Sequence, residues 1–154
     1  MKNKILTLNI KDKKIKFLLN KLRNDYPDSI PSFPHITIRG PRQNFNSSTI
    51  KKVENIIQSM SIEIVGIDIM EYKNLYFCVF KVQSPVLKDI WDKPDFPIKK
   101  FGFNPHITLY KGDKYIAERI KNKIELEERY KDLIIKSKDI EIKKSIIKQL
   151  ELAI

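Results

Sequence analysis

The feature that most constrains the fold is a short motif that occurs twice. Positions 33–38 read FPHITI and positions 104–109 read NPHITL, so both copies share a Pro-His-Ile-Thr segment. The two histidines, His35 and His106, lie 71 positions apart in a chain of 154 residues, which is close to half its length. Self-similarity at a long offset is typical of a duplicated structural unit. We therefore expect two related halves, of about residues 1–72 and 73–154.

The residues around the first motif predict a strand, a helix, the motif strand, a second helix and a third strand. Residues 4–10 alternate in the manner of a strand with one buried face. Gly66 predicts a bend in the third strand, which spans the isoleucines between 62 and 69. Apolar residues at helical spacing mark the two helices: Ile15, Leu18, Leu19, Leu22 and Tyr26, then Ile50, Val53, Ile57 and Met60 after a cap at Asn46 or Ser47.

The residues around the second motif predict the same order of elements. Residues 75–82 read as a strand, and Ser84-Pro85 predicts the start of a short helix that ends near Trp91. The motif strand follows, and a longer helix begins at about Asp113. Strands around 133–136 and within 140–153 close the chain.

The two halves together predict one domain, over residues 1–154, of the α+β class. The chain contains only four glycines and no low-complexity linker, so no boundary between independent domains is expected. Two similar lobes related by a pseudo-two-fold axis bring the two motif strands together at a central cleft.

The motifs predict proton-transfer chemistry at that cleft. Side chains alternate along a strand, so His35 and Thr37 share one face, and so do His106 and Thr108. Cleavage of a phosphodiester removes a proton from the attacking oxygen and delivers one to the leaving oxygen, and a neutral and a protonated imidazole supply both steps. Threonine hydroxyls bind the non-bridging oxygens. We expect a catalytic set of two histidines and two threonines that needs no metal or other cofactor.

Two other uses of the histidines remain open from the sequence. Both rings can be structural groups held by hydrogen bonds. They can also bind a metal ion, although zinc catalysis ordinarily takes three protein ligands and the chain has no His-Glu-x-x-His spacing.

Four neighbours of the motifs are candidates for substrate binding. Strand alternation places Arg39 on the face of His35 and Thr37, and Tyr110 on the face of the second motif, where it can stack on a base, bond a phosphate or close the core. Lys111 offers a positive charge, and Phe103 belongs to a loop whose rings either stack on bases or pin the loop down. Further basic residues near the motifs are Arg42, Lys99 and Lys100.

Composition is compatible with a nucleotide or RNA substrate but does not decide it. The net charge is +11, and a basic surface attracts polyanions. The richness in Lys, Ile and Asn is equally what an AT-rich coding sequence produces. Cys78, the only cysteine, lies in an apolar strand and is expected to be an inert buried thiol. Because no apolar run approaches the length of a membrane span and no signal-peptide cleavage site appears, we expect a cytoplasmic protein without membrane association.

The pair of motifs resembles that of the 2H phosphoesterase superfamily, whose signature is two His-hydrophobic-Thr/Ser-hydrophobic segments. The resemblance implies a duplicated, bilobal α+β fold with two pseudo-symmetric antiparallel sheets around a central cleft. It also implies that His35 and His106 form the acid–base pair and that Thr37 and Thr108 bind the phosphate. Relatives of this type act on RNA 2′,3′-cyclic phosphates or 2′–5′ linkages.

The expected function is therefore a metal-independent phosphodiesterase acting on a 2′,3′-cyclic phosphate, a 2′–5′ linkage or a cyclic oligonucleotide. Compact members of the superfamily include phage enzymes that degrade cyclic oligonucleotide signals of bacterial immunity, which is one alternative. The other is a nucleotide- or RNA-binding protein that keeps the fold without turnover.

Overall fold

The computed structural model describes residues 3–91 and 103–146 and has the α+β architecture expected from the sequence. Its first half contains β1 (Lys4–Ile10), α1 (Lys13–Asp25), β2 (His35–Arg42), α2 (Ser47–Ile57) and β3 (Ser61–Tyr72). Its second half contains β4 (Leu75–Gln83), α3 (Leu87–Ile90), β5 (His106–Gly112), α5 (Lys114–Glu125), β6 (Ile134–Lys136) and β7 (Ile140–Ile146), with 3-10 turns at Glu128–Tyr130 and Ser137–Asp139. The predicted order of elements in each half is confirmed.

Side-chain caps explain where the three long helices begin. The carboxylate of Asp12 accepts hydrogen bonds from the backbone N–H groups of Lys14 and Ile15 at the start of α1. Asn46 caps α2 in the same way, and Asp113 caps α5. Each cap pairs N–H groups that have no partner within the helix. The predicted helix start at Ser84-Pro85 is wrong, because α3 begins at Leu87 and has no side-chain cap.

The strands form two antiparallel sheets that exchange their third strands between the sequence halves. One sheet has the order β2-β1-β7 and the other β5-β4-β3-β6. Thus β3, from the first half, pairs with β4, while β7, from the second half, pairs with β1. The strands β2, β1 and β7 of the first sheet occupy the same order as β5, β4 and β3 of the second, and β6 is an additional strand. Each sheet therefore contains strands from both halves of the sequence.

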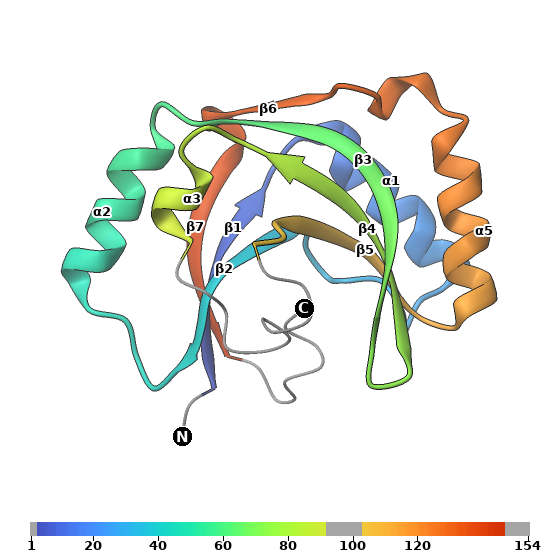
Figure 1. Ribbon diagram of the computed structural model, residues 1–154, viewed down its shortest axis with the longest axis horizontal. Coiled ribbons are helices and arrows are strands. Elements are labelled where there is room, and N and C mark those ends of the chain that lie inside the picture. The colour runs from blue at the N-terminus through green and yellow to red at the C-terminus, as the bar shows by residue number, and fades with distance from the viewer. Residues whose placement is uncertain (1–2, 92–102, 147–154) are drawn as a thin grey trace.

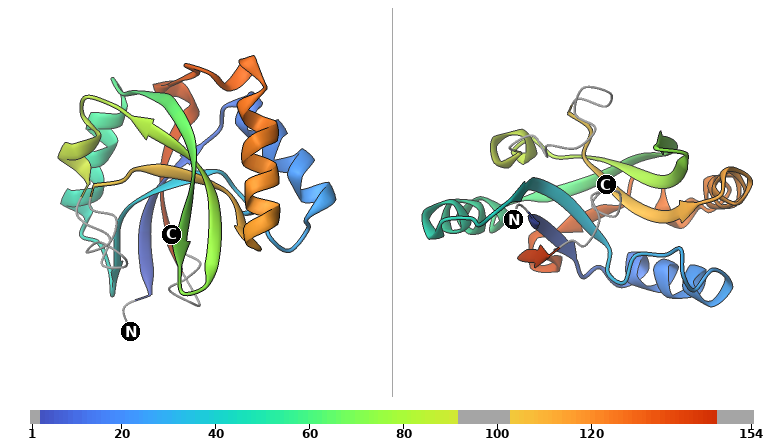
Figure 2. Two further views of the ribbon diagram at one scale, coloured as in Figure 1. Left: turned by 45° about the vertical axis from the view of Figure 1, so that its right-hand side comes forward. Right: turned by 90° about the horizontal axis from the view of Figure 1, so that it is seen from below.

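The helices lie at the two ends of this pair of sheets. In Figure 1, α1 and α5 are on the right and α2 and α3 on the left, and Figure 2 shows each pair together from two other directions. A continuous buried core joins the helices to both sheets and contains residues from both halves, among them Leu8, Ile36, Phe80 and Ile107. The predicted bend at Gly66 is present as a register shift between β3 and β4.

Candidate active site

The two motif strands come from different sheets and meet at the centre of the molecule. β2 and β5 contact each other although no ladder of hydrogen bonds joins them. His35 lies opposite Asn9 of β1, and Thr37 lies opposite Thr7, so the ring and the hydroxyl share a face. His106 and Thr108 lie opposite Lys81 and Val79 of β4 and likewise share a face. The predicted same-face arrangement is confirmed in both strands.

Both histidines are held by the same local hydrogen bond. Nδ1 of His35 lies 2.9 Å from the carbonyl oxygen of Phe33, and Nδ1 of His106 lies 2.7 Å from that of Asn104. A carbonyl oxygen only accepts, so Nδ1 carries the proton in each ring and donates it. In the neutral ring, Nε2 is then the nitrogen that accepts a proton. The two rings therefore present the same reactive atom from equivalent positions in the two halves.

Loss of solvation disfavours the charged form of both imidazoles. Loss of solvation lowers the pKa of His35 below its ordinary value, against the opposing effect of the bond to Phe33. The pKa of His106 is lowered to about 4, chiefly by the same cause, with the bond to Asn104 opposing it and the positive charges of Lys81 and of protonated His35 adding to it. The effect of His35 on His106 means that the two rings lie within electrostatic range of each other.

A pocket of about 330 Å³ is lined by one residue of each motif, His35 and Thr108, whereas Thr37 and His106 are not among its lining residues. Its walls are His35, Thr108, Lys111, Phe77 and the loop of residues 28–32. The backbone N–H of Lys111 donates to the carbonyl of Ser29 over 2.9 Å and joins that loop to β5. The volume is at the lower end of the range that small-molecule sites have. One imidazole, one threonine and one lysine thus share a wall with an aromatic ring.

A β-bulge follows the threonine in both motif strands and changes the direction of the next polar residue. In β5 the register shifts after Thr108, so that Tyr110 lies opposite Cys78 in the core. Tyr110 is only 2% exposed, and its hydroxyl accepts a hydrogen bond from the backbone N–H of Asp113 over 2.8 Å. The expectation that Tyr110 faces the cleft is wrong, and the alternative that it closes the core is confirmed. Lys111, rather than Tyr110, lies on the same side of β5 as Thr108.

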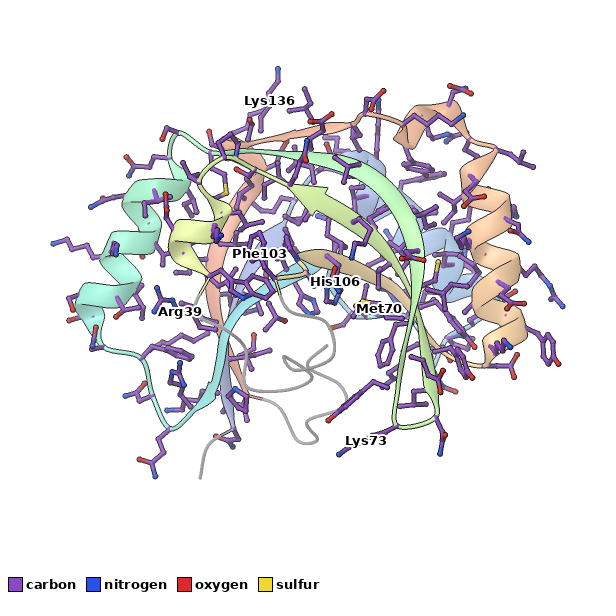
Figure 3. The ribbon with its side chains drawn as sticks, in the orientation of Figure 1. Arg39, Met70, Lys73, Phe103, His106 and Lys136 are labelled. Carbon is purple, nitrogen blue, oxygen red and sulfur yellow. The ribbon has the colours of Figure 1, made fainter. Side chains whose placement is uncertain are left out.

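The corresponding bulge in β2 affects Arg39. The register shifts after Thr37 and sets Arg39 opposite Leu6, which is a core residue. Nε of Arg39 donates to the carbonyl oxygen of Ile90 at the end of α3, over 3.2 Å. Figure 3 shows Arg39 on the side of α3, away from His106. The alternation that placed Arg39 beside His35 and Thr37 is therefore broken by the bulge.

Of the remaining candidates, Phe103 lies within the described residues. Phe103 is 48% exposed and meets the ring of Trp91 edge-on, with 5.2 Å between the ring centroids. Lys99 and Lys100 lie outside the described residues.

Sequence reasoning missed Lys81, which lies directly across from His106. Residues directly opposite each other in antiparallel strands have Cβ atoms about 5 Å apart. The signal was present, because Lys81 is the single charged residue in the apolar run from Leu75 to Val82. A charge in an otherwise buried strand indicates a specific partner.

Cys78 lies outside both motifs and is buried. Burial raises the pKa of the Cys78 thiol to about 12, so the thiolate is not formed at neutral pH. Among the described residues, no three His, Cys, Asp or Glu side chains are grouped as metal ligands. In the same part of the chain, no helix has the length and apolar character needed to cross a membrane.

Comparison with known proteins supplies no assignment for this site. The sequence matches no protein-family model and no curated protein. The functional argument therefore depends on the geometry of the two motif strands and on the charges around them.

Proposed function

We propose that the protein is a phosphodiesterase that cleaves an RNA-type or nucleotide phosphodiester by acid–base catalysis between His35 and His106. The observation that carries the proposal is the matched pair of imidazoles. Each ring is fixed through Nδ1, and the two rings are close enough for the charge of one to lower the pKa of the other. A pair of this kind transfers protons on both sides of one small group.

An anionic substrate brings a negative charge next to the two rings. The pKa values of both rings are lowered, so the neutral form of each imidazole is favoured without substrate. A phosphate charge about 4 Å from a ring attracts the imidazolium by roughly 4 kcal/mol at an effective dielectric constant near 20. This corresponds to about a thousandfold change in the protonation equilibrium. Binding of the phosphodiester therefore protonates one ring and prepares the pair for catalysis.

The surroundings decide which ring takes the proton. The residue across from His106 is a lysine, whereas the residue across from His35 is the neutral Asn9. A neighbouring positive charge disfavours the imidazolium, so the proton settles on His35. His106 then acts as the general base on the attacking oxygen, and His35 as the general acid on the leaving oxygen. Thr37 and Thr108 donate hydrogen bonds to the non-bridging oxygens.

The pocket supplies a positive charge for a phosphate. Lys111 lies on its wall beside Thr108, and an ammonium group is the kind of charge that a phosphate binds. The same wall contains the carboxylate of Asp28 and the buried ring of Phe77, which is only 1% exposed. The substrate class that we propose follows from the pair of motifs: 2′,3′-cyclic nucleotides and the ends of 2′–5′-linked or cyclic oligonucleotides.

A panel assay in excess EDTA tests the proposal. The purified protein is incubated with 2′,3′-cyclic mononucleotides, 2′–5′ oligoadenylates and cyclic di- and trinucleotides, and products are separated by chromatography. We expect turnover of at least one class, with a bell-shaped dependence of kcat/KM on pH. The variants His35→Ala and His106→Ala are the controls, and each is expected to bind that substrate without turning it over. Binding without turnover by the unaltered protein would instead support a nucleotide-binding function and overturn the proposal.

A further inference from the structure

Three side chains form a connected arm behind His106. The ammonium group of Lys81 donates a hydrogen bond to the side-chain oxygen of Asn104. The amide nitrogen of Asn104 donates to the sulfur of Met70 over 3.4 Å, and its backbone carbonyl accepts the Nδ1 proton of His106. In Figure 3, Met70 on the β3–β4 hairpin lies close to His106 at the start of β5. Asn104 is thus held on both sides of its amide and in turn holds the imidazole.

This arm occupies a place where an unpaired polar group would be destabilising. Asn104 is only 9% exposed, and the thioether of Met70 is a weak acceptor. The bond from Lys81 is therefore the strong one that fixes the Asn104 side chain, since a charged donor roughly doubles the strength of a hydrogen bond. A lysine ammonium has three donors, so the bond to Asn104 leaves Lys81 with capacity for other acceptors.

The first half has no equivalent charge opposite its histidine. The carbonyl that holds His35 belongs to Phe33, whose side chain has no hydrogen-bonding group. Across from His35, Asn9 accepts a hydrogen bond from the hydroxyl of Thr7 over 2.8 Å. The arm therefore distinguishes the second motif from the first within the shared frame.

We propose that Lys81 is a positioning residue for His106, which fixes the ring through Asn104 and provides a positive charge beside it. Among the described residues, the charges that act on the pKa of His106 are those of Lys81 on β4 and His35 on β2, and Lys111 lies further along β5 itself. Lys81 is the one placed directly across the ladder. The kinetic consequences rest on the proposed phosphodiesterase function, whereas the effect on the histidine itself does not.

Titration of the two histidines by NMR tests the proposal without any substrate. The chain has only two histidines, so the variants His35→Gln and His106→Gln assign the ring signals. Lys81→Gln keeps a donor for Asn104 and removes the charge, Lys81→Met removes both, and Lys81→Arg keeps both. We expect Lys81→Gln and Lys81→Met to raise the proton affinity of His106 about tenfold, with a smaller change at His35. Lys81→Arg should titrate like the unaltered protein.

A matched control and a kinetic measurement separate this role from a merely structural one. Lys131→Met removes one positive charge at an exposed ion pair with Glu128 and should leave both titrations unchanged. With a cleavable substrate, Lys81→Met is expected to lower kcat by 10- to 100-fold and to move the acidic limb of the pH profile to higher pH. Lys81→Arg is expected to restore most of the rate.

The outcomes of these measurements are distinct. An unchanged His106 titration in Lys81→Gln would overturn the proposal, whatever substrate the protein cleaves. If Lys81→Met does not fold, as judged by circular dichroism, Lys81→Gln still decides the question. A changed titration in a protein that cleaves nothing would support the role of Lys81 and contradict only the proposed phosphodiesterase function.

Discussion

The two motif strands carry the same residues in the same geometry, but their partner strands differ in charge. His35 lies across from the neutral Asn9, and His106 lies across from Lys81. Both rings nevertheless donate Nδ1–H to the carbonyl two residues earlier. The shared frame therefore fixes the direction of each ring, and the partner strand sets its electrostatic environment. Two equivalent rings in different environments are what an acid–base pair needs.

The threonines show the same contrast. Thr37 lies across from Thr7, a buried hydroxyl, whereas Thr108 lies across from the apolar Val79. The face around Thr108 continues into a small apolar cluster of Met70, Phe77 and Val79. The residues directly across from the second motif are therefore the charged Lys81 and the apolar Val79, and those across from the first motif are the neutral polar Asn9 and Thr7.

Loss of either ring is the largest effect that we expect. His35→Gln and His106→Gln should each lower kcat by about 10²- to 10⁴-fold, because each removes one of two coupled proton transfers. The double variant should be little worse than either single one, since residues that act as a unit are not additive. Rates are measured under single-turnover conditions with the best substrate of the panel. Two effects that multiply independently would indicate that the rings do not act on the same phosphate.

Removal of the hydroxyls is expected to cost less. Thr37→Val and Thr108→Val keep the shape of the side chain and remove a hydrogen bond to a charged group, which contributes about 1.5–3 kcal/mol. We therefore expect a fall in kcat/KM of roughly 10- to 100-fold in each variant. Thr108 is only 5% exposed, so its variant also needs a check by thermal unfolding. Full activity in both variants would show that phosphate is bound by other groups.

Acid should weaken the fold through the second motif. The pKa of His106 falls from 6.5 to about 4 on folding, so the unfolded chain binds the proton more tightly. This contribution to the free energy of unfolding is complete above about pH 6.5 and is lost as the pH falls toward about 4. Between about pH 7.5 and about pH 5 the loss is roughly 2 kcal/mol. Urea unfolding of the unaltered protein and of His106→Gln at a series of pH values measures this loss, because the carboxylates contribute equally to both proteins and cancel in the difference. If the free energy of unfolding depends on pH in the same way in both proteins, folding does not bury His106 as a neutral ring.

Much of the frame was predictable from the sequence because it depends on local patterns. The alternation of side chains along a strand predicted that His35 shares a face with Thr37 and His106 with Thr108. The helical spacing of apolar residues predicted the long helices. Tyr110 was misplaced because a bulge depends on how two strands pair, and no local pattern contains that register.

The same limit applies to the other residues that the sequence misassigned or missed. Arg39 follows the equivalent bulge, and Lys81 becomes a neighbour of His106 only once β4 pairs with β5. The exchange of β3 and β7 between the sheets is likewise a choice among strand pairings that alternation leaves open.

The smallest expected effect comes from giving the first half the charge that the second half has. Asn9→Lys places an ammonium group across from His35, in the position that Lys81 has relative to His106. We expect the proton affinity of His35 to fall by roughly three- to tenfold in an NMR titration, because the two positive charges repel each other. Asn9→Met is the matched control, since it also removes the acceptor for Thr7 but adds no charge. If the partner strands set the environments of the rings, Asn9→Lys makes the two titrations more alike, and kcat falls because His35 holds its proton less often. Equal titrations in Asn9→Lys and Asn9→Met would instead mean that burial alone controls both rings, and the contrast between the two halves would then have no part in catalysis.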